Sequence, residues 1–182
     1  MGWFSRKPTQ EDYNKAVVNV ATNLYLLTTS PDSPHELRFK RPDSRFRYLA
    51  FCLVAVVSTT LAYDEKKRIN PSELINACCL FLTWIAQNHP SDYFDAGCDA
   101  NEAALQAEDY LRDFAAKWSL WPSFENQSQS YQFQGVIAEM IHSIETGKPY
   151  TEEDEYRLRP LALQIDCQLL TMREAVVGLA SK

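Results

Sequence analysis

The side chains best suited to chemistry are concentrated in one polar segment, residues 89–102, with the sequence HPSDYFDAGCDANE. Imidazole and carboxylate groups are common metal ligands. The candidate ligands in this segment are His89, Asp92, Asp95 and Asp99. They do not follow the aspartate and glycine spacing of an EF-hand calcium loop. As an alternative, the segment therefore predicts the site of a metal-dependent enzyme or hydrolase.

The same segment has a simpler interpretation as a connection between two helices. Asp99 can cap the helix that follows it, and Glu102, three residues later, can complete a capping box. Cys98 is a poor candidate nucleophile, because the neighbouring carboxylates are expected to raise its pKa and suppress the thiolate. We favour this structural interpretation of the segment over a catalytic one.

A second metal-ligand pattern is the ExxH pair formed by Glu139 and His142. Helical bundles that bind two metal ions use this spacing, with both side chains pointing into the core. The apolar stripe of this helix, which includes Ile137 and Met140, predicts instead that His142 faces solvent. No second ExxH pair occurs in the chain, so we predict no di-metal centre and no cofactor.

Motifs of nucleotide-binding and hydrolytic enzymes are missing from the chain. Neither GxGxxG nor GxxxxGK[ST] nor GxSxG occurs, and these are the loops that bind phosphates or present a catalytic serine. The chain has only three histidines, so an assembled pair of nucleophile and base is not expected. A non-catalytic role is favoured, and the enzyme alternative stays open.

Two features of the sequence could bind a protein partner. The aromatic residues Trp118, Trp121 and Phe124 follow a predicted helix. They could anchor a partner or a second subunit, or they could fold back as a lid on the bundle. The second feature is an acidic run, made of Glu152, Glu153, Asp154 and Glu155. It could contact a basic partner, although acidic groups in the first turn of a helix are also stabilised by the backbone dipole.

A basic patch precedes the longest apolar run. Its members are Arg38, Lys40, Arg41, Arg45 and Arg47. Cations interleaved with aromatic residues are typical of nucleic-acid surfaces. The sequence pI of about 5.1 argues against nucleic acid as the partner, because such proteins usually carry a strongly basic face. The simpler prediction is that these side chains pair with the acidic helices of the same fold.

The apolar run that follows Arg47 raises the question of a membrane span. It contains 16 residues without charge before Asp64. At 1.5 Å per residue, a helix of this length spans about 24 Å, which is less than the roughly 30 Å hydrocarbon core of a bilayer. A buried core helix is therefore predicted. Peripheral membrane contact through Trp3 and Phe4, helped by the basic patch, is a third alternative.

The elements that must position these residues are predicted to be helices. Apolar residues recur at helical spacing in every long segment, and alternating strand-like runs are missing. The prediction is an all-α, single-domain bundle of about six helices at residues 9–182, after a flexible tail at residues 1–8. The helices at about 44–66 and 71–88 are apolar nearly all round, which predicts central positions. Pro160 falls inside the last helix and predicts a kink or a second start.

Composition sets the remaining expectations. The chain has 182 residues, of which 46% are hydrophobic and 23% are charged, as in ordinary globular domains. An odd number of cysteines and the lack of a signal-peptide pattern predict a reducing, cytoplasmic setting. Residues 1–68 carry 11 Lys/Arg and 7 Asp/Glu, and residues 69–182 carry 7 and 17. We expect a non-catalytic protein-interaction module of adaptor, inhibitor or immunity type, with an acidic and aromatic surface and with a homodimer as one arrangement.

Overall fold

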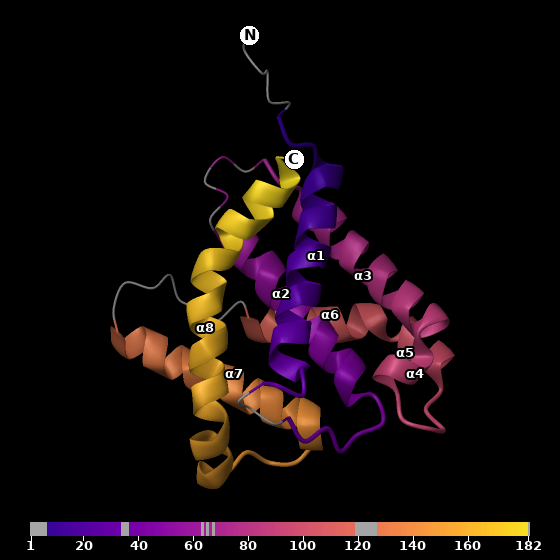
Figure 1. Ribbon diagram of the computed structural model, residues 1–182, viewed down its shortest axis with the longest axis vertical. Coiled ribbons are helices and arrows are strands. Elements are labelled where there is room, and N and C mark those ends of the chain that lie inside the picture. Colours follow the sequence, from indigo (N-terminus) through magenta and orange to yellow (C-terminus); the bar gives the residue numbers. More distant parts are fainter. Residues whose placement is uncertain are drawn as a thin grey trace.

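A computed structural model shows that the chain folds into packed helices, which confirms the all-α prediction (Figure 1). It describes residues 7–33, 37–62, 64, 66, 68–118 and 127–181, and at 115–118, 127–133, 170 and 173 it describes the backbone alone. The helices are α1 (Gln10–Thr29), α2 (Ser44–Ala62), α3 (Pro71–Asn88), α4 (Pro90–Tyr93), α5 (Ala100–Leu105), α6 (Ala107–Trp118), α7 (Gln127–Thr146) and α8 (Glu152–Ala180).

Local capping explains where three of the long helices begin. The Thr9 hydroxyl accepts a hydrogen bond from the Asp12 N–H at 3.3 Å, and the Asp12 carboxylate accepts one from the Thr9 N–H at 2.8 Å. Thr151 and Asp154 form the same reciprocal box at the start of α8. Asn70 caps α3 through its side-chain oxygen, with proline in the first helical position. Each cap satisfies backbone N–H groups that have no partner within the helix.

α2 is the centre of the bundle, as its sequence predicts. Of its 19 residues, 14 are buried, and it packs against α1, α3, α6, α7 and α8. Within the described residues, α2 is the one helix long and apolar enough to cross a membrane, and 72% of its most apolar window is buried inside the protein. A core helix surrounded by other helices has the same length and composition. α2 ends at Ala62, four residues before the predicted end.

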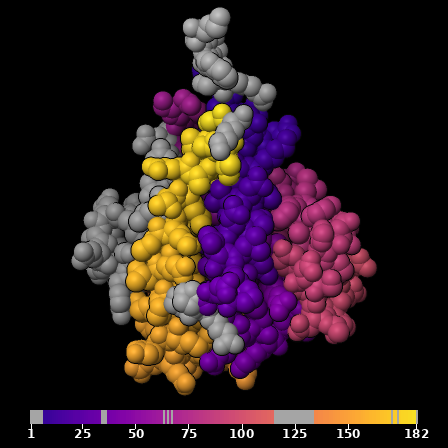
Figure 2. All heavy atoms as spheres, in the orientation of Figure 1, coloured from indigo at the N-terminus to yellow at the C-terminus, as the bar shows by residue number. Residues whose placement is uncertain are grey.

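α3 does not have the central position that its sequence predicts. Its inner face, including Leu74, Cys78 and Leu82, is buried, but Leu80 is 63% exposed and Trp84 is 49% exposed. In Figure 2, the segment that begins with α3 covers one side of α1, while α8 lies along the other side. α3 has apolar residues nearly all round its surface, but other helices cover only its inner face.

Two other predictions about helix boundaries differ from the structure. The single helix expected at residues 99–118 is divided into α5 and α6 at Gln106, after the short helix α4. The break keeps Ala103, Ala104 and Ala107 buried, so both pieces pack against α3. α8 continues through Pro160 without the second start that was one of the two alternatives there. Because of α4 and the division at Gln106, the described residues form more helices than the six expected.

Candidate functional site

The most exposed apolar part of α3 forms the first candidate site, which we call the α3 surface and define as Leu80, Phe81 and Trp84. Leu80 and Trp84 are four residues apart and therefore neighbours on one helix face. The rings of Phe81 and Trp84 stack with centroids 6.4 Å apart. The Trp84 ring also lies 5.0 Å from the ring of His89. The α3 surface therefore presents an ordered aromatic group to solvent, although most of the other large apolar side chains are buried.

Carboxylates surround the α3 surface on several sides. Glu73 is exposed and lies two turns before Leu80 on the same helix face. Glu108 lies beside Cys79, whose pKa is raised by burial and then by that carboxylate. At the other end, the Asp92 carboxylate lies 3.6 Å from Nδ1 of His89. The α3 surface is thus apolar in the middle and acidic at its edges.

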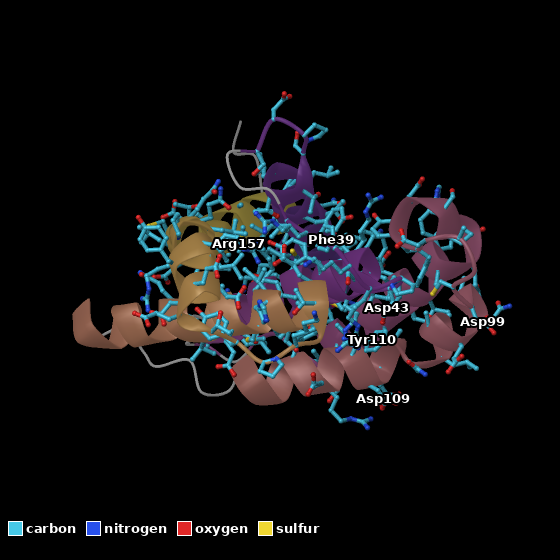
Figure 3. All side chains as sticks on the ribbon, turned by 90° about the horizontal axis from the view of Figure 1, so that it is seen from below. Phe39, Asp43, Asp99, Asp109, Tyr110 and Arg157 are labelled. Atoms are coloured by element: carbon cyan, nitrogen blue, oxygen red, sulfur yellow. The ribbon has the colours of Figure 1, made fainter. Side chains whose placement is uncertain are left out.

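The charge of this part of the chain is strongly negative. Residues 71–118 contain eight Asp/Glu and two Lys/Arg. Arg112 compensates part of this charge, because it pairs with Glu108 at 2.5 Å and with Asp109 at 3.4 Å. Figure 3 shows Asp99 and Asp109 at the outer edge of the same region. The net charge of −6 in this segment equals that of the whole chain, so the remaining residues sum to zero.

The segment at residues 89–102 is a helix connection with a local cap. The Asp99 carboxylate accepts hydrogen bonds from the N–H groups of Asn101 at 3.0 Å and Glu102 at 3.2 Å, as predicted for a capping residue. Asp95 uses its backbone N–H to bind the Pro42 carbonyl at 3.1 Å. The predicted ligands His89, Asp92, Asp95 and Asp99 are not gathered, since the described residues contain no group of three or more His, Cys, Asp or Glu placed to hold a metal ion. The role as a metal-dependent enzyme therefore stays a prediction, and the described residues do not bring a set of metal ligands together.

Cys98 has the raised pKa that its neighbours predict. Partial burial of the thiol raises the pKa most, followed by the negative charges of Asp43, Asp99, Glu102 and Asp95. The thiolate is the reactive form of cysteine. A raised pKa therefore disfavours Cys98 as a nucleophile at neutral pH.

Two members of the basic patch bind one local carboxylate instead of the acidic helices. Arg47 lies 3.8 Å from Asp43, and Arg41 lies 3.7 Å from it. The Arg47 guanidinium also stacks 4.6 Å from the centroid of the Tyr110 ring, whose hydroxyl donates to Asp43 at 3.0 Å. Figure 3 shows Asp43 and Tyr110 close to each other. This cluster joins the start of α2 to α6, and both arginines are only partly exposed.

The rest of the basic patch is exposed, but its backbone is fixed by a buried carboxylate that the sequence analysis missed. Glu145 is fully buried, accepts a hydrogen bond from the Arg38 N–H, and pairs with Arg157 at 2.5 Å. Its carbonyl accepts from the Lys40 N–H at 2.8 Å. The Ser44 hydroxyl donates to the neighbouring carbonyl of residue 144 at 2.7 Å. The segment before α2 is thus bound to the end of α7 and to α8.

His142 is buried, so the prediction that it faces solvent was wrong. It is 4% exposed, because Tyr150 and the first turn of α8 cover it. Nε2 lies 3.1 Å from the Pro149 carbonyl, and Nδ1 lies 3.2 Å from the Asp154 carboxylate. Glu139, the other member of the ExxH pair, is exposed, so the two side chains do not converge on one ligand site.

The acidic run at the start of α8 is divided between structural and exposed roles. Asp154 caps the helix, and its pKa is lowered chiefly by the hydrogen bond from the Thr151 hydroxyl. Glu155 pairs with Arg159 on the next turn. Glu152 and Glu153 are exposed, and these two carboxylates are the part of the run that could meet a partner.

The aromatic contacts predicted from sequence lie outside the described residues. This holds for Trp121 and Phe124, for the side chain of Trp118, and for Trp3 and Phe4. Their roles in partner or membrane binding therefore stay predictions.

Comparison with known proteins gives no family for this chain. No family model, no curated protein and no solved structure matches it. The functional argument consequently depends on the geometry of the described residues alone.

Proposed function

We propose that this chain is a cytoplasmic, non-catalytic interaction module that binds a basic protein partner through the α3 surface. The observation that carries the proposal is the exposure of Leu80 at 63% and Trp84 at 49% on the outer face of a helix whose inner face is buried. Adaptors, inhibitors and immunity proteins are functional types that work by such binding. The proposal keeps the acidic and aromatic character expected from the sequence, and it assigns that character to other residues.

The α3 surface has the composition of an interface centre. Tryptophan is enriched among residues that dominate binding energy, and such residues are usually surrounded by polar groups that exclude water. Trp84 is held in place by its stacking on Phe81, so little side-chain freedom is lost when a partner covers it. A rigid aromatic group therefore gives more affinity than a mobile one of the same area.

The acidic edges decide which partner is favoured. Glu73 and Asp92 would attract a partner with basic groups around an apolar pocket, whereas the charge of Glu108 is already compensated by Arg112. In a symmetric dimer through the same face, each surface meets its own copy, so acidic edges would face acidic edges. The proposed partner of the α3 surface is therefore a different, basic protein. Homodimer formation through the same surface is the competing outcome.

The thiols support a cytoplasmic location. All five cysteines are free, and two of them, Cys52 and Cys78, are buried and have pKa values raised by burial. Unpaired buried thiols are usual in proteins of reducing compartments.

Site-specific photocrosslinking tests the proposal directly. A photoreactive phenylalanine analogue replaces Leu80 in one variant and Leu163, a residue of α8 that is 47% exposed, in the control. We expect one dominant crosslinked protein of basic pI from position 80 in cells of the native host, and none from position 163. Equal products from both positions, or a crosslink between two copies of this chain, would contradict the proposal.

A further inference from the structure

A cavity of about 320 Å³ lies between the end of α1 and the segment that leads into α2. It is separate from the α3 surface, since the two share no residue. Its described lining includes Tyr25, Thr28, Thr29, Ser30, Phe39 and Arg45. We propose that this cavity binds a small organic phosphate, with the phosphate at Arg45 and an apolar body against Phe39.

Arg45 places an exposed positive charge at the wall of the cavity. It is the one charged residue among the described lining residues, and within the described part of the chain it forms no ion pair, unlike Arg41 and Arg47 beside it. A guanidinium at the wall of a cavity that pairs with no carboxylate of the described residues is a candidate to bind an anion. Its planar set of N–H donors fits the oxygen atoms of a phosphate.

The hydroxyl groups of the cavity wall differ in whether their hydrogen is free to donate a hydrogen bond. Thr28 and Thr29 donate to carbonyls of α1 at 2.8 Å and 2.7 Å, so their hydrogens are already used. The Ser30 oxygen accepts from the Asp32 N–H at 3.3 Å, which leaves its own hydrogen available to donate. Burial raises the pKa of Tyr25, so it keeps its proton, but its side chain is already hydrogen-bonded with Thr29. Arg45 and Ser30 are therefore the free donors among these described residues.

This set of donors favours phosphate over carboxylate. Arg45 and Ser30 can donate hydrogen bonds, and a phosphate monoester has three terminal oxygens to accept them. A phosphate monoester also carries roughly two negative charges at neutral pH, whereas a carboxylate carries one, so its attraction to Arg45 is stronger.

The apolar part of the cavity wall determines which organic group of a ligand would fit. Phe39 and Leu37 are partly buried, and the Phe39 ring is fixed 5.9 Å from the ring of Tyr48. Figure 3 shows Phe39 near the middle of the molecule, away from the outer edge marked by Asp99. The volume lies at the lower end of the roughly 300–1,000 Å³ typical of ligand sites, which suits a ligand with a single ring.

Isothermal titration with phenyl phosphate tests this inference on the full chain. We expect saturable one-to-one binding, and a loss of affinity of about tenfold or more in Arg45→Gln, because a charge-assisted bond is removed. Arg38→Gln is the matched control, because Arg38 is exposed in the same basic patch but does not line the cavity. Its affinity should stay within about twofold of the parent protein.

Further ligands separate a built site from general attraction to a basic surface. Inorganic phosphate lacks the ring, and benzoate lacks the third oxygen, so both should bind more weakly than phenyl phosphate. The inference is overturned by no binding of phenyl phosphate at millimolar concentration, by equal losses in Arg45→Gln and Arg38→Gln, or by tighter binding of benzoate. An unchanged melting temperature of Arg45→Gln without ligand confirms that a loss of binding is not a loss of folding.

Discussion

α2 and α3 are similar in sequence character but differ in environment. Both are apolar nearly all round, yet 14 of 19 residues are buried in α2 and five of 18 in α3. α2 has helices on all sides, whereas α3 packs its inner face only. The same composition thus serves the core in one helix and an exposed surface in the other. An apolar helix at the edge of a bundle is a candidate binding surface.

The two helices also differ in how their starts are fixed. The segment before α2 is bound across the bundle through Glu145 and through the Ser44 hydroxyl. α3 begins with its own cap, Asn70, whose backbone N–H donates to Gln10 at 2.8 Å. Loss of an anchor should therefore cost much at α2 and little at α3, which gives a graded set of predictions.

The largest effect is expected in the core of α2. Phe51 is fully buried, with its ring 5.6 Å from Tyr48 and 6.1 Å from Phe114. Phe51→Ala should lower the free energy of unfolding by about 3–5 kcal/mol, because it removes buried apolar area and leaves a cavity. Urea denaturation measures this change. A loss below about 1 kcal/mol would mean that the centre of the bundle is not close-packed.

The next effect concerns the anchor of α2. Glu145→Gln leaves Arg157 without its counter-charge and should cost about 3 kcal/mol, the lower end for a broken buried pair, since Arg157 reaches solvent. Glu139→Gln is the control, because Glu139 is exposed on the same helix and should change stability by less than about 0.5 kcal/mol. Equal effects of the two substitutions would remove Glu145 as an anchor.

A smaller effect is expected at the start of α3. Asn70→Ala removes the side-chain oxygen that accepts from the N–H groups of Ser72 and Glu73. The expected cost is about 1 kcal/mol, typical of a lost N-cap. Asn76→Ala, at an exposed position inside the helix, should not destabilise the protein. A cost at Asn70 as large as that at Glu145 would contradict the difference between the two helices.

The smallest effect on stability is expected on the α3 surface itself. Leu80→Gln keeps helix propensity and changes a side chain that is 63% exposed, so stability should change by less than about 0.5 kcal/mol. Thermal unfolding measures this. If the substitution destabilised the protein by several kcal/mol, Leu80 would belong to the core and the α3 surface would not be available to a partner.

Local features of this chain could be predicted from its sequence. Asp99 caps a helix as predicted, and Thr9, Asn70 and Thr151 cap helices by the same local rule, because a cap depends on residues within one turn. The central position of α2 was also predicted correctly, because a run of that length without charge is stable only when covered.

Features that depend on neighbours far along the chain could not be predicted. His142 is buried because the first turn of α8 covers it, and Glu145 is buried because Arg157 and the segment before α2 bind it. The exposure of Leu80 and Trp84 likewise depends on which helices pack beside α3. The sequence pattern of a single helix contains none of these contacts. The α3 surface was therefore found in the structure alone, because the acidic and aromatic contacts predicted from the sequence lie at other residues.

The most direct test of the central claim is the affinity of the crosslinked partner for Trp84→Ala, measured beside Leu163→Ala. Trp84 is 49% exposed and Leu163 is 47% exposed, so the two substitutions remove similarly exposed apolar side chains from different helices. We predict a loss of about 30-fold or more for Trp84→Ala, equivalent to about 2 kcal/mol, and a change within about twofold for Leu163→Ala. Equal affinities of the two variants, both close to that of the parent protein, would contradict the assignment of α3 as the binding surface.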